Sequence, residues 1–149
     1  MTTVDRTDLE AKVKDMYRRV AERPTERYHF EMGRGLAERL GYPGDLLDRI
    51  PAAAIESFAG VGYFHDLADL RAGERVVDLG SGSGTDSFAA AVTVGTRGRV
   101  IGVDFTAEQL AKARRLAAAA GLDQVEFREG RIEALPVDDA SVDLSLIHI

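Results

Sequence analysis

The sequence predicts an α/β fold: a Rossmann-like parallel sheet with helices on both faces, truncated after about four strands and preceded by an N-terminal helical segment. Two observations predict it. From Glu74 onward, short apolar runs rich in β-branched residues alternate with helical runs, and each short run is apolar on both faces, as in a buried parallel sheet. A glycine-rich turn joins the first short run to the next helix. Right-handed crossovers then give a Rossmann-like half.

The second half of the chain supplies these strands and helices in alternation. Strands are expected at residues 75–79, 98–105, 124–130 and 141–149. Helices are expected at residues 85–94 and 106–121. The second helix carries its own boundary signals, because Thr106 and Gln109 form a capping-box pattern and Gly121 stands where a C-terminal glycine belongs.

The first part of the chain has a helical pattern. Apolar residues at helical spacing occupy residues 5–23, 30–45 and 50–60. Pro24 ends the first of these runs, a Gly-Tyr-Pro-Gly break ends the second, and Pro51 suits the start of the third. We therefore expect an N-terminal helical cap over residues 1–72. A cofactor-binding Rossmann-like domain, incomplete at its C-terminus, is expected over residues 73–149.

Composition and charge exclude several classes of function. The chain has 149 residues, a formal net charge of −6 and no cysteine, which excludes disulfides, thiolate metal sites and cysteine nucleophiles. The acidic balance, without a dense basic block, argues against a nucleic-acid surface. No segment has the apolar run of a signal peptide or a membrane span. We expect a cytoplasmic protein with a small-molecule substrate and no nucleic-acid, membrane or metal partner. The sequence leaves the oligomeric state open.

The end of the sequence is abrupt. Its last residues, LSLIHI, are also what a common sequencing-library adapter encodes in one reading frame. A doubly wound sheet that stops at a fourth strand leaves an apolar edge exposed, which soluble proteins avoid. We therefore expect a fragment whose native sequence stops near Asp143. The alternative, that LSLIHI is a genuine buried strand, stays open.

The glycine loop indicates the class of ligand. Gly80, Gly82 and Gly84 follow the first strand, and glycine permits positive φ angles and close approach of a ligand to the backbone. A phosphate-binding P-loop would end in Gly-Lys-Ser/Thr, whereas this loop continues with Thr85 and Asp86. A dinucleotide fingerprint would need glycine in place of Thr85, and a carboxylate at position 86 would repel a pyrophosphate.

Acidic residues around this loop favour a cationic ligand. S-adenosyl-L-methionine carries an ammonium and a sulfonium group, so Asp78 and Asp86 are favourable neighbours for it. Asp104 ends the second strand, where a carboxylate can accept hydrogen bonds from the ribose hydroxyls of NAD or of S-adenosyl-L-methionine. The segment after the third strand places Ile132 and Glu133 where an adenine could stack and be hydrogen-bonded.

Three stretches together resemble the motifs of class I S-adenosylmethionine-dependent methyltransferases: VVDLGSGSGTD, GRVIGVDFTAEQLAKAR and EFREGRIEALPVDDASVDL. The arsenite methyltransferases are the nearest look-alikes, and the resemblance covers roughly residues 72–143. With the residue chemistry above, the predicted cofactor-binding residues are Asp78, Gly80, Ser81, Gly82, Gly84, Asp86, Asp104, Phe105, Ile132 and Glu133.

The resemblance also implies a role for each part of this set. The methionine portion would lie against Asp78 and the glycine loop, and the ribose against Asp104. The adenine would lie on Phe105, with its edge at Ile132 and Glu133. The chain departs from the pattern after the third strand, where many members carry an acid and this chain has Arg131.

A second departure concerns the methyl acceptor. Arsenite methyltransferases bind arsenic through cysteine thiolates, one of them in a GCG segment shortly before the first strand, where this chain has Val61 in AGVGY. Arsenic is soft and prefers thiolate ligands, which this chain lacks. We therefore expect methyl transfer to a different, unidentified small-molecule acceptor.

Three alternatives remain open at this stage. They are an arsenite methyltransferase relative without the cysteine site, an NAD(P)-dependent oxidoreductase, and an inactive cofactor-binding fragment. No residue is singled out as a general base, so the catalytic residues are unassigned. Asp86 is equally well a partner of its helix N-terminus, and His65 is expected to be a surface or packing histidine. Tyr17 resembles a tyrosine that relatives fold over the cofactor, but a core position on a helix is favoured.

Overall fold

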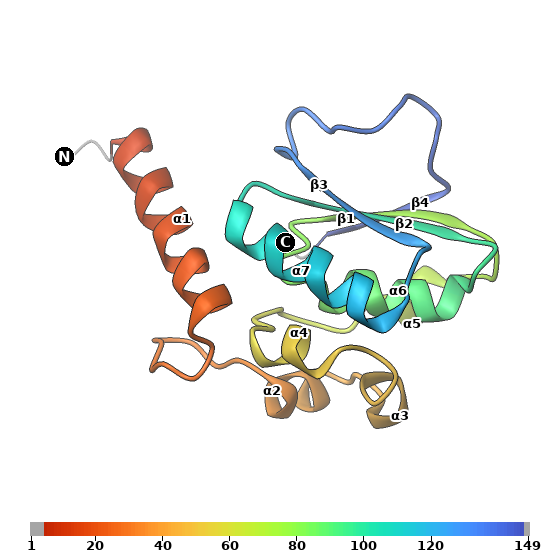
Figure 1. The fold of residues 1–149 in the computed structure, drawn as a ribbon, viewed down its shortest axis with the longest axis horizontal. Coiled ribbons are helices and arrows are strands. Elements are labelled where there is room, and N and C mark those ends of the chain that lie inside the picture. Colours follow the sequence, from red (N-terminus) through yellow and green to blue (C-terminus); the bar gives the residue numbers. More distant parts are fainter. Residues whose placement is uncertain (1–4, 148–149) are drawn as a thin grey trace.

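Residues 5–147 form seven helices and four strands in the computed structural model, which describes this part of the chain (Figure 1). The helices are α1 (Arg6–Glu22), α2 (Arg34–Arg39), α3 (Gly44–Leu47), α4 (Ala52–Glu56), α5 (His65–Ala68), α6 (Thr85–Val94) and α7 (Ala107–Ala120). The strands are β1 (Arg75–Leu79), β2 (Arg99–Asp104), β3 (Val125–Glu129) and β4 (Leu144–Ile147). The four strands and the two helices predicted between them are therefore confirmed.

The four strands form one parallel sheet in the order β3-β2-β1-β4. β1 pairs with β2 so that Asp78 lies beside Gly102, and β2 pairs with β3 so that Asp104 lies beside Glu129. Because the strands are parallel, the loops that follow Leu79 and Asp104 leave the sheet at the same edge. Ligands of open α/β sheets bind at this edge.

The two faces of the sheet are covered differently. α6 and α7 lie on one face, while the segment 130–143 arcs over the other without forming a helix (Figure 1). The crossovers from β1 to β2 and from β2 to β3 advance in the same direction, so right-handed connections place both helices on the same side. Among the described residues, helices therefore cover one face of the sheet, as predicted. In this same part of the chain, the second face is crossed only by the segment that connects β3 to β4, which forms no helix.

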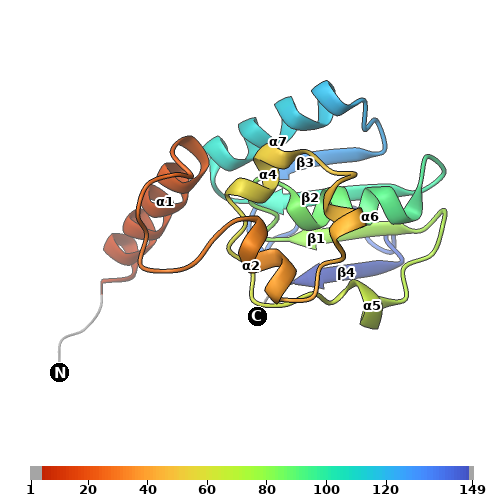
Figure 2. The same cartoon turned by 90° about the horizontal axis from the view of Figure 1, so that it is seen from below.

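One hydrophobic cluster joins the helical segment to the sheet. Leu47, Ile55 and Phe58 from the helical segment are buried in the same cluster as Val76 of β1 and Phe88 of α6. α4 packs against α7, which it overlies in Figure 2, while α3 contacts α6 and α2 contacts α4. Since the two parts share a core, each loses buried apolar surface without the other. The boundary between residues 72 and 73 stays a prediction.

The helix termini follow most of the local signals. Asp5 caps α1 by accepting a hydrogen bond from Thr7 N at 2.9 Å, and Gly121 ends α7 with φ +63° as predicted. The predicted capping box is wrong: Thr106 is the N-cap residue of α7, but its side chain makes no capping bond, and the side chain of Gln109 bonds other elements. The Gly-Tyr-Pro-Gly segment, predicted as a break, leads directly into α3 after Pro43.

The last described strand lies at the edge of the sheet. β4 pairs with β1 in parallel, and Leu146 is buried against the core. His148 and Ile149, the end of the LSLIHI stretch, lie outside the described residues. Within residues 5–147, no helix is both long and apolar enough to cross a membrane.

We expect the substitution Gly84→Ala to destabilise the fold more than Gly121→Ala, although both glycines have positive φ. A Cβ at Gly121 would meet nothing within 4 Å, so its cost is the backbone strain of about 1 kcal/mol. A Cβ at Gly84, where φ is +97°, would lie 2.7 Å from Phe127 Cζ and 2.9 Å from Phe88 Cε2. Displacing these core rings adds about 1–3 kcal/mol. Urea unfolding followed by circular dichroism measures both losses, and equal losses would contradict the tight packing below the loop.

Candidate functional site

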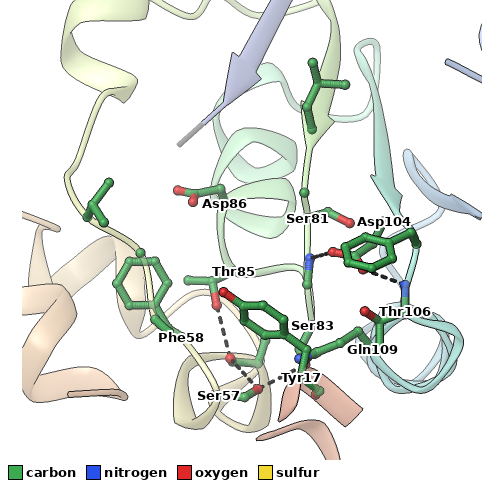
Figure 3. A pocket seen from close by; sticks show the side chains of 18 residues that line it. Tyr17, Ser57, Phe58, Ser81, Ser83, Thr85, Asp86, Asp104, Thr106 and Gln109 are labelled. Atoms are coloured by element: carbon green, nitrogen blue, oxygen red, sulfur yellow. Dashed lines mark hydrogen bonds between the residues drawn. The ribbon is translucent and has the colours of Figure 1, made fainter. Parts of the chain in front are cut away.

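A pocket of about 340 Å³ opens at the carboxyl ends of β1 and β2 (Figure 3). Its walls come from the glycine loop, from the start of α7 and from the segment 57–61 that follows α4. Six of the predicted cofactor-binding residues line it: Gly80, Ser81, Gly82, Asp86, Asp104 and Phe105. The pocket has the size of a small-ligand site.

The glycine loop is held in place by β2. Gly80 N and Ser81 N both donate to Val103 O, at 2.8 and 3.0 Å. The tight turn needs positive φ at Gly80 (+74°) and Gly82 (+54°), which residues with a Cβ rarely adopt. The loop backbone is therefore fixed relative to the end of β2 before any ligand binds.

Asp104 connects the loop to the start of α7. Its Oδ2 accepts a hydrogen bond from Gly82 N at 2.9 Å, and its Oδ1 accepts one from Thr106 N at 2.8 Å (Figure 3). The residue is 9% exposed and lines the pocket. Each carboxylate oxygen can accept two hydrogen bonds, so both oxygens keep capacity for a ligand hydroxyl. Phe105 lies next to it, with Lys14 of α1 5.3 Å from the ring centroid.

Asp86 lies in the first turn of α6 and faces the pocket from the side of Phe58, away from Asp104 (Figure 3). Its Oδ1 accepts a hydrogen bond from the hydroxyl of Tyr42 and lies 3.0 Å from Nε2 of His65. Both Asp86 and His65 are 7% exposed. Burial, reinforced by the Asp86 carboxylate, raises the pKa of Tyr42 far above its usual range, so the hydroxyl remains a donor.

These contacts bear on one reading of the sequence. Of the surface and packing positions expected for His65, the packing position is correct, because the side chain is buried on α5 and stacks on Tyr63. The carboxylate partner is the part that the sequence does not predict. The signal for this pairing is absent from local sequence, because His65 and Asp86 are 21 positions apart and Tyr42 is 44 positions from Asp86.

Asp78 lies below the loop. It is 1% exposed, its Oδ2 accepts a hydrogen bond from Ser87 Oγ at 2.6 Å, and it does not belong to the residues that line the pocket. Gly84 also lies outside the lining, at the N-cap of α6. The structure therefore places both residues where they support the loop.

Ile132 and Glu133 line a second cavity of about 340 Å³ that adjoins the first. The two cavities share Gly80, Asp104 and Phe105, so the predicted set is divided between neighbouring spaces. Ile132 is 55% exposed. Arg131, the departure noted in the sequence, forms an ion pair with Glu10 of α1 across this second cavity.

A directional chain of hydrogen bonds ties the helical segment to the loop. Lys112 Nζ donates to Ser57 Oγ at 3.0 Å, and Ser57 Oγ approaches Ser83 Oγ at 3.0 Å. Ser83 Oγ donates to Gln109 Oε1, and Gln109 Nε2 donates to Tyr17 O at 3.0 Å. Burial lowers the pKa of Lys112. This chain explains why Gln109 is not available for the capping box.

Two pocket residues bear directly on a ligand. Ser81 Oγ is buried, lines the pocket and has no hydrogen-bond partner among the described residues. Because buried hydroxyls are rarely left unpaired, this atom fits a polar ligand group. Tyr17 lines the pocket and is 36% exposed, so its predicted position in the core is wrong.

The segment before β1 adds an apolar wall. Val61, which stands at the position compared above with the GCG cysteine of arsenite methyltransferases, lines the pocket and is 61% exposed. Among the described residues, no group of three or more histidine or acidic side chains could hold a metal ion.

Comparison with known proteins points to one family. A family model described as "Methyltransferase domain" matches residues 70–148. The arsenite methyltransferase of Halobacterium salinarum is 45% identical over 108 residues, which are 72% of this chain and 27% of that protein. The demethylmenaquinone methyltransferase of Shouchella clausii is 37% identical over 75 residues, which are 50% of this chain and 32% of that protein.

A solved structure gives the same result for the fold. An arsenic(III) S-adenosylmethionine methyltransferase from Chlamydomonas reinhardtii is similar with a TM-score of 0.52 at 31% identity, covering 77% of this chain and 38% of that chain. The Rossmann-like fold class is thereby confirmed. This chain spans 27% and 32% of the length of the two curated relatives.

The hydrogen-bond chain makes a prediction for stability. Ser57→Ala removes the partner of the buried Lys112 ammonium and should lower the free energy of unfolding by about 1–3 kcal/mol. Adding Lys112→Met removes the stranded charge, so the double variant should recover part of this loss. Denaturant unfolding of the two single variants and the double variant measures the coupling, and additive losses would show that the two side chains do not depend on each other.

Proposed function

Because this chain belongs to the family of methyltransferase domains, we propose that its pocket binds S-adenosyl-L-methionine and that the protein transfers the methyl group to a small-molecule acceptor. One observation carries the proposal: among the described residues, the charged side chains that line the pocket are those of Asp86 and Asp104, with no lysine or arginine. Two carboxylates favour a cationic guest and oppose a pyrophosphate.

We assign the parts of the cofactor to residues as follows. The glycine loop and Ser81 would hold the methionine portion, because Ser81 Oγ needs a partner there. Asp104 would hold the ribose hydroxyls with its remaining acceptor capacity. Phe105 would lie against the adenine, and Ile132 and Glu133 would border it in the adjoining cavity.

Asp78 and Gly84, which are predicted to bind the cofactor, would act on it indirectly through the loop. Asp78 holds Ser87 at the start of α6, and Gly84 starts that helix, so both fix the loop that would contact the methionine portion. We propose that the helical segment within residues 1–72 acts as a cap, since Tyr17 and the segment 57–61 form one wall of the pocket.

Bound S-adenosyl-L-methionine would supply an activated methyl group on a cationic sulfur, which a nucleophile attacks in line. The chain would contribute binding and orientation, because the leaving group needs little further activation. The negative charge of the pocket would face a sulfonium cation, which becomes a neutral thioether when the methyl group is transferred. We assign no catalytic base.

For the acceptor, we propose a small molecule other than arsenite. Relatives of similar sequence are named for arsenite and for demethylmenaquinone, so similarity does not select the acceptor. This chain has no cysteine, and Val61 occupies the pocket wall where a thiolate would be needed. Soft arsenic prefers thiolate ligands, so this chain builds no arsenic site. The net charge of −6 likewise supports a small molecule over a nucleic acid.

Calorimetric titration of the chain tests the proposed cofactor. We expect saturable binding of S-adenosyl-L-methionine and of S-adenosylhomocysteine, and no binding of NAD, because a pyrophosphate would face the two pocket carboxylates. A thermal melt by circular dichroism in the same buffer controls for folding. Saturable NAD binding without a response to either sulfur ligand would reverse the assignment.

We expect Asp104→Ala to weaken binding of S-adenosyl-L-methionine at least about tenfold, or about 1.4 kcal/mol, because it removes both the ribose partner and the anchor of Gly82 N. Asp123→Ala, a loss of the same charge at an exposed site between α7 and β3, is the matched control and should leave the affinity unchanged. An unchanged dissociation constant for Asp104→Ala would remove Asp104 from the site.

A further inference from the structure

The pocket carboxylate of Asp86 is held by two side chains that no motif of the sequence contains. Tyr42 comes from the turn between α2 and α3, and His65 is the first residue of α5. The Tyr42 hydroxyl and the His65 imidazole both reach Oδ1 of Asp86, the histidine with Nε2 at 3.0 Å. Three separate segments of the chain therefore meet at one atom of the pocket wall.

Both donors are fixed in place by packing. Tyr42 is 3% exposed, and its ring lies 5.1 Å from that of Phe58 and 4.7 Å from that of Tyr63, centroid to centroid. The His65 ring stacks on Tyr63 with a centroid distance of 5.4 Å and an interplanar angle of 1°. Neither donor can turn away from Asp86 without disturbing this aromatic cluster.

The chemistry fixes the direction of the hydrogen bonds. An ionised carboxylate only accepts, so the tyrosine hydroxyl and a protonated Nε2 of His65 must both donate to Oδ1. Nδ1 of His65 is buried without a partner among the described residues, so it imposes no competing orientation on the ring. Two donors on one oxygen keep the position of the carboxylate constant.

A helix N-terminus alone would not require this arrangement. A carboxylate in the first turn of α6 already interacts favourably with the helix dipole. Two further polar side chains are nevertheless buried on the same oxygen, and their hydrogen bonds to it offset the cost of burying them. Asp86 lines the pocket on the side opposite Asp104, beyond the loop proposed to hold the methionine portion.

We propose that Tyr42 and His65 are positioning residues, which hold the Asp86 carboxylate where it favours the charged methyl donor over the neutral product of the reaction. This inference rests on the proposed function. S-adenosyl-L-methionine and S-adenosylhomocysteine share the ammonium group, and only the first carries a sulfonium. A fixed negative charge near the sulfur therefore strengthens binding of the first relative to the second.

The test is the ratio of the dissociation constant of S-adenosylhomocysteine to that of S-adenosyl-L-methionine, measured by calorimetry on the full chain. We expect Asp86→Asn to weaken S-adenosyl-L-methionine about tenfold and S-adenosylhomocysteine less than about twofold. Tyr42→Phe keeps the ring packing and removes one donor, so it should lower this ratio, as Asp86→Asn does. Tyr63→Phe, in the same aromatic cluster, is the matched control and should leave the ratio unchanged.

Variants at His65 separate positioning from packing. His65→Gln can place an amide donor where Nε2 lies and should keep the wild-type ratio, whereas His65→Phe keeps an aromatic ring without the donor and should lower the ratio. Equal weakening of both ligands in Asp86→Asn and Tyr42→Phe, or no weakening of either, would overturn the proposal. A wild-type chain that binds neither sulfur ligand would instead contradict the proposed function itself.

Discussion

The hydrogen bond from Gly82 N to the Asp104 carboxylate is the interaction on which the pocket depends. It joins the loop after β1 to the end of β2 at 2.9 Å, and it forms only because parallel pairing brings these two strand ends to one edge. The positive φ angles of Gly80 and Gly82 turn the amide toward the carboxylate. A side chain in place of either glycine would strain the turn and shift the site together with the fold.

The helical segment contributes both apolar packing and polar contacts to the pocket at the edge of the sheet. Its apolar residues share one core with β1 and α6, and its polar contacts reach the pocket from two sides. On one side, Ser57 and Lys112 connect α4 and α7 to the loop through Ser83. On the other side, Tyr42 and His65 hold Asp86. The glycine loop and the Asp86 carboxylate are therefore each held by several segments, which would preorganise the charges around the proposed cofactor.

Local sequence determined the elements and their order, while the contacts between distant segments could not be predicted from it. The strand at Arg75–Leu79 and the helix at Thr85–Val94 have the bounds that the sequence predicts, because apolar periodicity and flanking glycines act locally. Gln109 fits a capping box locally, but tertiary contacts with Ser83 and Tyr17 take its side chain instead. The aromatic cluster around Asp86 gives no sequence signal, because its members come from unrelated turns.

We propose that one anionic crevice, built around Asp104, holds the cofactor of this methyltransferase domain. A crystal structure of the chain grown with S-adenosylhomocysteine tests it most directly. We expect ribose hydroxyls within hydrogen-bond distance of the Asp104 carboxylate, with the amino-acid end of the ligand on the loop around Ser81. Ligand density outside this crevice, or a ribose that leaves Asp104 without contact, would contradict it.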